Sequence, residues 1–271
     1  MQNLIQRSLT ATIFVIVFLG SILLGKITFI LLCYAIMVGC LWEFYDFYRE
    51  SEHPPRIIRG FLMGTAIFLL TAFLALHLSH LLLFSFLAPI FFLFPISTLI
   101  YNKKESLISS ALTLMGIFYC VIPVCFFLWV GFMIGNKYNI HIILGPVFFI
   151  WFNDTGAYVF GNLLGKNTMM EKISPGKTWE GFIGGALSAI LLAWFLSKYF
   201  HELNSIQWMV LALIVVISGT LGDLVESLYK RELKIKDSGK FFPGHGGVLD
   251  RFDSFLMSAP FIYFFLTLIQ K

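Results

Sequence analysis

Charged residues are scarce in this sequence, and their scarcity excludes a water-soluble fold. Asp, Glu, Lys and Arg make up 13% of the 271 residues, about half the share that is usual in soluble domains. Hydrophobic residues make up 58%, and Phe alone occurs 31 times. Too few charged side chains are present to cover a soluble domain, so we expect a protein whose surface faces lipid.

Cysteine and long basic runs are equally rare. The four cysteines all lie in apolar stretches and form no C-x-x-C pair, so neither a disulfide framework nor a zinc site is expected. The net charge of +4 is modest, and no basic run is long enough to indicate a nucleic-acid partner. No small-residue cleavage site follows the first apolar segment, so we expect a retained helix rather than a removed signal peptide.

Long apolar runs, by contrast, are abundant. About 20 apolar residues suffice for an α-helix to cross the hydrocarbon core of a bilayer. We predict an all-α integral membrane protein with about nine transmembrane helices. The first two should form a tight hairpin at Gly25 and Lys26, and the fifth should tilt or kink near Pro123. The predicted helices cover residues 8–24, 27–47, 57–78, 81–101, 107–134, 141–163, 181–200, 206–229 and 254–269.

The basic residues indicate which ends of these helices face the cytoplasm. With nine spans, 15 of the 19 Lys and Arg residues fall on one side of the membrane. By the positive-inside rule that side is cytoplasmic, so we expect the N-terminus in the cytoplasm and the C-terminus outside. The longest polar segments lie on the same side. We therefore divide the chain into N-terminal transmembrane helices (1–135) and C-terminal transmembrane helices that carry a cytoplasm-facing site (136–271).

Asp154 is the first candidate site residue. It lies in an otherwise apolar span, beside Asn153 and Thr155. A carboxylate at membrane depth costs at least about 2.5–3.5 kcal/mol, so it indicates a functional site. The alternative is structural, with Asp154 hydrogen-bonded to a neighbouring helix or paired with a lysine.

The polar segment that follows contains Ser174, Lys177 and Thr178 just before the next span. Thr178 is placed to cap that span, and a helix N-terminus beside a lysine suits a phosphate group. The Gly-Lys-Thr triplet is not a P-loop, because Glu171 stands where the motif requires glycine and no β-strand is expected before it. A plain capped turn is the alternative.

Carboxylates are densest around the last two spans. Asp223 lies near the cytoplasmic end of one span, while Asp250 and Asp253 open the next and share one helix face. Oxygen-only ligands favour a hard cation such as Mg²⁺, and Gly246 and Gly247 permit the backbone to approach a ligand closely. A solvated surface connector is the alternative.

These motifs resemble those of a known family. The stretch 227–253, with its Lys-Arg and Lys-Asp pairs and its Pro-Gly-His-Gly-Gly-Val-Leu-Asp-Arg-Phe-Asp run, is similar to the signature of the CTP:phosphatidate cytidylyltransferases. Residues 153–158 and 165–181 resemble that family's second conserved region. The N-terminal half is similar only in hydropathy.

The resemblance implies transfer of CMP from CTP to phosphatidic acid, which gives CDP-diacylglycerol and pyrophosphate in phospholipid biosynthesis. It implies Mg²⁺, with K⁺ reported beside it in the family, and the expected metal ligands are Asp223, Asp250, Asp253 and Asp154. The expected catalytic residues are Asp223, Asp250, Asp253, His245 and Lys236. The expected phosphate- and nucleotide-binding residues are Ser174, Lys177, Thr178, Lys230, Arg231, Gly246, Gly247 and Arg251. We expect a protein of the bacterial inner membrane; a homodimer is left open.

Two other functions are open at this point. A CTP-dependent lipid-alcohol kinase would transfer the γ-phosphoryl group and release CDP instead of pyrophosphate. An ion-coupled transporter would also carry intramembrane carboxylates, but spread along several spans. In the N-terminal half, Glu43 and Asp46 are the only carboxylates within the predicted spans, and both are near one helix end.

Overall fold

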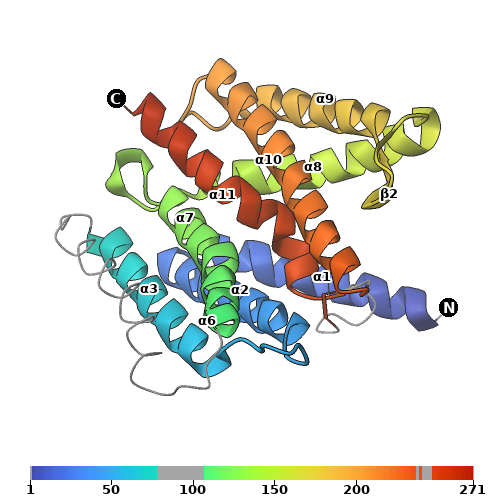
Figure 1. The fold of residues 1–271 in the computed structure, drawn as a ribbon. Helices are drawn as coiled ribbons and strands as arrows, with labels where there is room; N and C mark the ends of the chain where they lie inside the picture. The colour runs from blue at the N-terminus through green and yellow to red at the C-terminus, as the bar shows by residue number, and fades with distance from the viewer. Residues whose placement is uncertain (1, 78–106, 236–237, 240–245, 271) are drawn as a thin grey trace. The chain divides into compact units, whose positions relative to one another are not determined.

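The chain is almost entirely helical in a computed structural model that describes residues 2–77, 107–235, 238–239 and 246–270. Figure 1 shows its helices and one small hairpin. In chain order the elements are α1 (Gln2–Leu23), α2 (Lys26–Phe47), α3 (Ile57–His77), α6 (Leu107–Gly116), the π-helical turn η1 (Ile117–Val121), α7 (Ile122–Val130), the 3₁₀ turn η2 (Ile134–Asn136), α8 (Ile140–Leu164), β1 (Thr168–Met170), β2 (Ser174–Thr178), α9 (Trp179–Leu196), α10 (Ser205–Glu232) and α11 (Leu249–Ile269).

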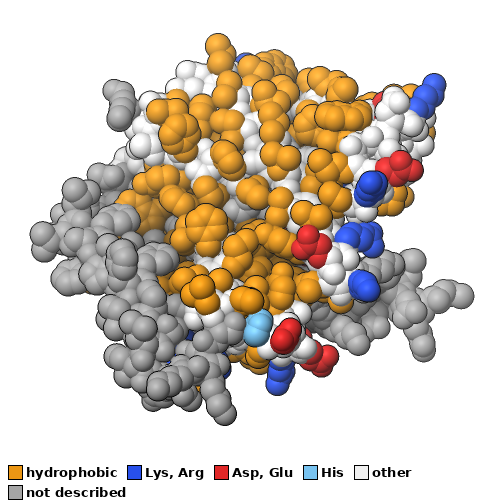
Figure 2. Space-filling view, viewed as in Figure 1, with side chains coloured by type: hydrophobic (Ala, Val, Ile, Leu, Met, Phe, Trp, Pro, Cys, Tyr) orange, Lys and Arg blue, Asp and Glu red, His pale blue; other side chains and the backbone are white. Residues whose placement is uncertain are grey.

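The helices have the length and composition of membrane spans. Among the described residues, seven helical segments are long and apolar enough to cross a bilayer, and Ser8–Leu23 forms a shorter apolar helix. Hydrophobic side chains cover most of the described surface in Figure 2, as expected for a protein surrounded by lipid. The predicted all-helical membrane architecture is confirmed. The predicted span 81–101 lies outside the described residues, so the count of nine and the orientation of the termini stay predictions.

The described chain divides into two compact units, and each has its own core. The first comprises Met1–Phe132 and Ser238–Leu249, and the second comprises Met133–Asp237 and Asp250–Lys271. The predicted division at residue 135 concerned where the chemistry lies, and it stays a prediction.

In the first unit, α2 packs against α3 and α7. Its buried face includes Phe29, Met37 and Tyr45, and the Tyr45 hydroxyl donates a hydrogen bond of 2.8 Å to the Thr113 carbonyl oxygen. The tight turn expected between the first two helices is present at Gly25, whose φ of +129° favours glycine.

The span formed by α6, η1 and α7 changes its helical pitch where a tilt or kink was predicted. The π-helical turn η1 lies directly before Pro123, which stands in the first turn of α7. Proline has no amide hydrogen and its ring clashes with the carbonyl one turn earlier. A wider π turn accommodates that lost hydrogen bond without ending the helix.

In the second unit, α8 and α9 pack closely along their length, and α10 contacts both. Glycines on α9 make this approach possible. A Cβ atom at Gly185 would lie 2.5 Å from Asn153 Oδ1, and one at Gly181 would lie 2.8 Å from the Ala157 carbonyl oxygen. Small residues at such contacts are typical of helix pairs in membranes, where close packing is a main source of attraction.

A two-stranded antiparallel hairpin, β1–β2, connects α8 to α9. The expectation that no β-strand precedes the Gly-Lys-Thr triplet was wrong. Hydropathy did not indicate this hairpin, because its strands are only three and five residues long and lack an alternating pattern. Charged side chains gather at this end of the second unit in Figure 2. The first turn of α9 starts at Trp179, and the Thr178 hydroxyl accepts a 3.1 Å hydrogen bond from the Gly181 amide, so the predicted cap is confirmed.

We expect Gly185→Ala to lower the unfolding free energy by about 1–3 kcal/mol, because the added methyl group overpacks the α8–α9 contact. Gly20→Ala is the matched control, since a Cβ atom there meets nothing within 4 Å and alanine favours the helix. Thermal unfolding in detergent measures both. Equal melting temperatures for the two variants would contradict the packing argument.

Candidate active site

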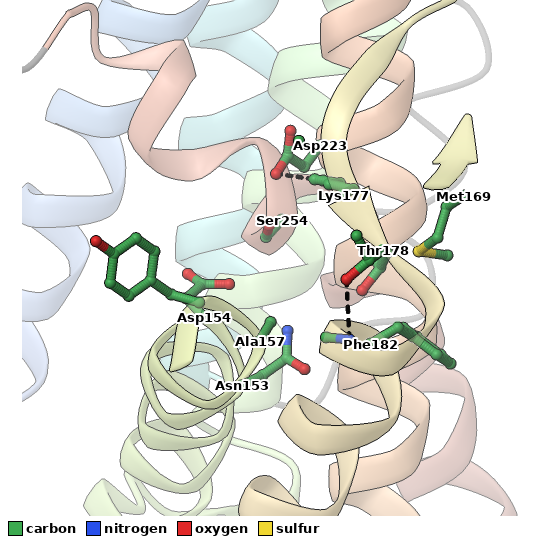
Figure 3. Close-up of a pocket in the computed structure, with 13 residues that line it drawn as sticks. Asn153, Asp154, Ala157, Met169, Lys177, Thr178, Phe182, Asp223 and Ser254 are labelled. Atoms are coloured by element: carbon green, nitrogen blue, oxygen red, sulfur yellow. Dashed lines mark hydrogen bonds and ion pairs between the residues drawn. The ribbon is translucent and has the colours of Figure 1, made fainter. Parts of the chain in front are cut away.

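A pocket of about 280 Å³ opens among the helices of the second unit. Figure 3 shows its walls, which come from α8, the β1–β2 hairpin, α9, α10 and α11. Polar side chains line much of it, and among them are Asn153, Asp154, Lys177, Thr178, Thr220, Asp223 and Ser254. The pocket therefore brings together the first two polar segments that the sequence indicated and one carboxylate of the third.

Glu180 holds the hairpin that supplies Lys177 to this pocket. Its carboxylate accepts a 2.7 Å hydrogen bond from Asn167 Nδ2 and longer ones from the backbone amides of Lys166 and Asn167. The Trp179 amide donates to the Asn167 carbonyl oxygen at 2.9 Å. The end of α8 is thereby fastened to the start of α9, which limits how far the hairpin can move.

Lys177 reaches from the hairpin to α10. Its Nζ atom lies 2.5 Å from Asp223 Oδ2, and both side chains are partly exposed; the pair is drawn as a dashed line in Figure 3. An ammonium group has three N–H donors, so Lys177 can keep Asp223 and still donate to an anionic ligand in the pocket. The arrangement is suited to a phosphate group beside a carboxylate.

Asp223 of this ion pair also belongs to a group of three carboxylates. Oxygen atoms of Asp223, Glu226 and Asp253 lie within 4.8 Å of one another. Asp223 and Glu226 are three residues apart on α10, which places them on one face of that helix. Gly222 lets α11 approach, because a Cβ atom there would lie 2.6 Å from the Asp253 carbonyl oxygen.

Lys230 binds two of the carboxylates in this region. Its Nζ atom lies 2.6 Å from Glu226 Oε2 and 2.8 Å from Asp250 Oδ1. The Lys230 side chain is 14% exposed and that of Glu226 only 1% exposed. A buried carboxylate needs such a partner, because removing one member of a buried ion pair leaves an uncompensated charge.

The cluster has the ligand chemistry of a hard divalent cation. All three groups are carboxylates, which Mg²⁺ prefers over nitrogen and sulfur ligands. The buried Glu226 Oε1 atom finds no hydrogen-bond partner within the described part of the chain, and a buried polar atom without a partner is costly. A cation among the three carboxylates would satisfy this oxygen and offset their mutual repulsion.

The predicted site residues are distributed over this region in four ways. The structure brings Asp223 and Asp253 together, with Glu226 as the third carboxylate. Asp154, Lys177 and Thr178 line the pocket with Asp223. Asp250 is paired with Lys230. Three other predicted residues lie nearby. Ser174 is the first residue of β2, and Arg231 Nε donates a hydrogen bond of 3.1 Å to the Ile173 carbonyl oxygen. Arg251 is exposed in the first turn of α11.

The glycine-rich loop before α11 is described only from Gly246 onward, and Lys236 and His245 lie outside the described residues. Gly246 has φ = +83°, a conformation that favours glycine. A Cβ atom at Gly247 would meet the Ser238 hydroxyl and the Glu43 carboxylate. In the described structure, the close approach at Gly247 is therefore to a side chain of the same chain.

Sequence reasoning assigned no role to Glu226, although two signals were available. Glu226 stands one helical turn after Asp223 and one turn before Lys230, and side chains at such spacings meet on a helix surface. Glu43 was also left without a role. It accepts hydrogen bonds from Ser238, Val248 and Leu249, which are far away in the sequence, so local spacing could not have found it.

Comparison with known proteins identifies the family of this chain. The sequence profile of the Cytidylyltransferase family matches residues 5–269. The chain is 36% identical over 262 residues to a phosphatidate cytidylyltransferase of Staphylococcus saprophyticus, with 94% of this chain and 96% of the relative covered. It is 35% identical over 276 residues to the phosphatidate cytidylyltransferase of Bacillus subtilis (strain 168), and both chains are covered completely.

The chain belongs to the cytidylyltransferase family. The resemblance inferred from the C-terminal motifs is thereby confirmed. It also extends through the N-terminal half, where only the hydropathy was similar. The predicted enzyme class, a nucleotidyltransferase, is confirmed with it.

We expect Lys230→Gln to lower the unfolding free energy by about 3 kcal/mol, because it leaves two poorly exposed carboxylates without their shared cation. Adding Glu226→Gln should recover part of that loss, since one of the uncompensated charges is removed. Unfolding in detergent followed by circular dichroism measures both.

Arg231→Gln is the matched control, because Arg231 is exposed and its Nε atom donates to a backbone carbonyl. We expect it to change the unfolding free energy by less than about 1 kcal/mol. An equal loss in Lys230→Gln and Arg231→Gln would show that the two-carboxylate bridge is not important for stability.

Proposed function

We propose that this chain is a phosphatidate cytidylyltransferase, which transfers CMP from CTP to phosphatidic acid and releases pyrophosphate. A phosphatidate oxygen forms the new bond to the α-phosphorus of CTP, and the bond from that phosphorus to the β-phosphate oxygen breaks. The observation that carries the proposal is the carboxylate cluster of Asp223, Glu226 and Asp253 beside a pocket that contains Lys177. Membership of the cytidylyltransferase family supports it.

We propose Asp223, Glu226 and Asp253 as the residues that hold Mg²⁺, with Asp154 and Asp250 as neighbouring carboxylates and K⁺ as a second cation. Two observations support this assignment: Glu226 Oε1 has no hydrogen-bond partner among the described residues, and all the proposed ligand atoms are oxygens. When bound, Mg²⁺ neutralises phosphate charge and stabilises the pyrophosphate leaving group. Glu226 is an addition to the ligands expected from the sequence.

Basic side chains around the carboxylates reduce the repulsion between two anionic substrates. Lys177 has the clearest position for this, because it lines the pocket and pairs with Asp223. Lys230, Arg231 and Arg251 are proposed phosphate-binding residues of the same region, together with Lys236 from the segment outside the described residues. A phosphate monoester is already ionised at neutral pH, so attack on CTP requires no strong protein base; His245 remains a sequence-based candidate.

The bilayer explains why a nucleotide enzyme is built from apolar helices. The acyl chains of phosphatidate can stay in the membrane while its phosphate meets the polar ends of α10 and α11. We propose an integral protein of the bacterial inner membrane, with the N-terminus and the site in the cytoplasm and the C-terminus outside, because the basic residues favour this side. A homodimer is a hypothesis that light scattering of the detergent-solubilised protein can test.

The reaction is tested with CTP labelled at two different phosphates. Purified protein is incubated in detergent with phosphatidate and Mg²⁺, using CTP that carries ³²P at either the α or the γ position. We expect the α label to enter the lipid and the γ label to appear in pyrophosphate. Entry of the γ label into a lipid alcohol would instead identify a CTP-dependent kinase. Absence of both lipid products would overturn the proposal.

We expect Asp253→Asn to reduce CDP-diacylglycerol formation about 100-fold or more, because even residues that only orient a metal ligand contribute about 10–100-fold. Asp46→Asn is the matched control, since Asp46 is exposed and its carboxylate lies 3.7 Å from the exposed Arg49 guanidinium group. The initial rate of α-label transfer measures both. Wild-type activity in a folded Asp253→Asn protein would remove Asp253 from the site.

A further inference from the structure

Glu43 is a buried carboxylate on α2 that binds the segment leading into α11. Glu43 is 6% exposed. Its carboxylate accepts hydrogen bonds of 2.8 Å from the amides of Val248 and Leu249, one on each oxygen. A third bond of 3.1 Å comes from the Ser238 hydroxyl. All of these residues belong to the first compact unit.

The two amides lie where α11 begins, since Leu249 is its first residue and Val248 directly precedes it. The first amides of a helix lack partners inside the helix, and a negative charge there interacts favourably with the helix dipole. Glu43 therefore does for α11 what a capping side chain ordinarily does, but from a residue about 200 positions earlier in the chain. The hydrogen bonds also compensate the burial of the charge.

The surrounding glycines fit this contact. A Cβ atom at Gly247 would meet both oxygens of Glu43, and one at Gly239 would lie 2.8 Å from Glu43 Cδ. One turn earlier on α2, Gly39 leaves room for Val248, whose methyl carbons lie 3.0 Å from where its Cβ atom would be. The loop is thus shaped at several positions to receive one face of α2.

We infer that Glu43 is a positioning residue for Asp253, the proposed metal ligand on α11. Leu249, which Glu43 binds through its amide, directly precedes Asp250 in the same helix, and Asp253 follows one helical turn after Leu249. Hydrogen bonds to two successive amides fix the backbone where the helix begins. The inference rests on the proposed function, because Asp253 is proposed there as a metal ligand.

The test measures metal binding directly, without substrate turnover. Purified full-length protein in detergent is titrated with Mn²⁺, a paramagnetic substitute for Mg²⁺, and free Mn²⁺ is followed by electron paramagnetic resonance. We expect Glu43→Gln to raise the Mn²⁺ dissociation constant about tenfold or more, as with other residues that orient metal ligands. Its amide NH₂ group would face one of the two backbone N–H donors.

Three further variants make the result specific. Glu43→Asp keeps the carboxylate but shortens its reach, so its dissociation constant should fall between those of the wild type and Glu43→Gln. Asp46→Asn removes an exposed carboxylate from the same helix and should bind Mn²⁺ as the wild type does. Asp253→Asn tests the metal site itself and should lose Mn²⁺ binding.

The outcomes separate the inference from the proposed function. Loss of Mn²⁺ in Asp253→Asn together with wild-type binding in folded Glu43→Gln overturns the positioning role and leaves the proposed site standing. Wild-type binding in Asp253→Asn removes that residue from the metal site, and the inference fails with it. If Glu43→Gln does not fold, Ser238→Ala decides, since it removes one hydrogen bond and should raise the dissociation constant at least about threefold; an unchanged constant overturns the role.

Discussion

The cost of holding carboxylates among apolar helices is the constraint on which the rest of the structure depends. An unpaired buried charge is strongly unfavourable, and the charge is more costly still at membrane depth. Glu226 is almost completely buried, and Lys230 one turn later bonds both to it and to Asp250. Lys177, on the hairpin, pairs with Asp223. These two lysines therefore offset the negative charge of the carboxylates that they contact.

Close helix packing is the second requirement, because convergent side chains need short distances between their helices. Glycine provides these distances at Gly185, where α9 meets α8, and at Gly222, where α10 meets α11. A larger residue at either position would separate the helices that carry the site. The same glycines would look like ordinary features of a membrane helix if only hydropathy were considered.

The helical fold could be predicted because each span is encoded locally by a run of apolar residues. Pro123 marked the change of pitch in the span formed by α6, η1 and α7, and Thr178 marked the start of α9. The hairpin could not be predicted, since its strands are only three and five residues long and show no alternation of apolar and polar residues. The motifs predicted where carboxylates occur along the chain, but not which three of them lie together. Asp223 and Asp253 group with Glu226, whereas Asp250 pairs with Lys230. This grouping depends on how α11 is rotated relative to α10, which sequence spacing alone does not determine.

Glu43 shows why the remaining part of the site was out of reach. Its sequence signal, a carboxylate in an apolar span, is the same as that of Asp154, yet its partners are two amides and a hydroxyl from the loop before α11. Backbone amides carry no residue identity, so no motif on the partner segment points back to Glu43. A buried charge compensated by backbone rather than by a basic side chain is thus the kind of positioning contact that only a three-dimensional structure reveals.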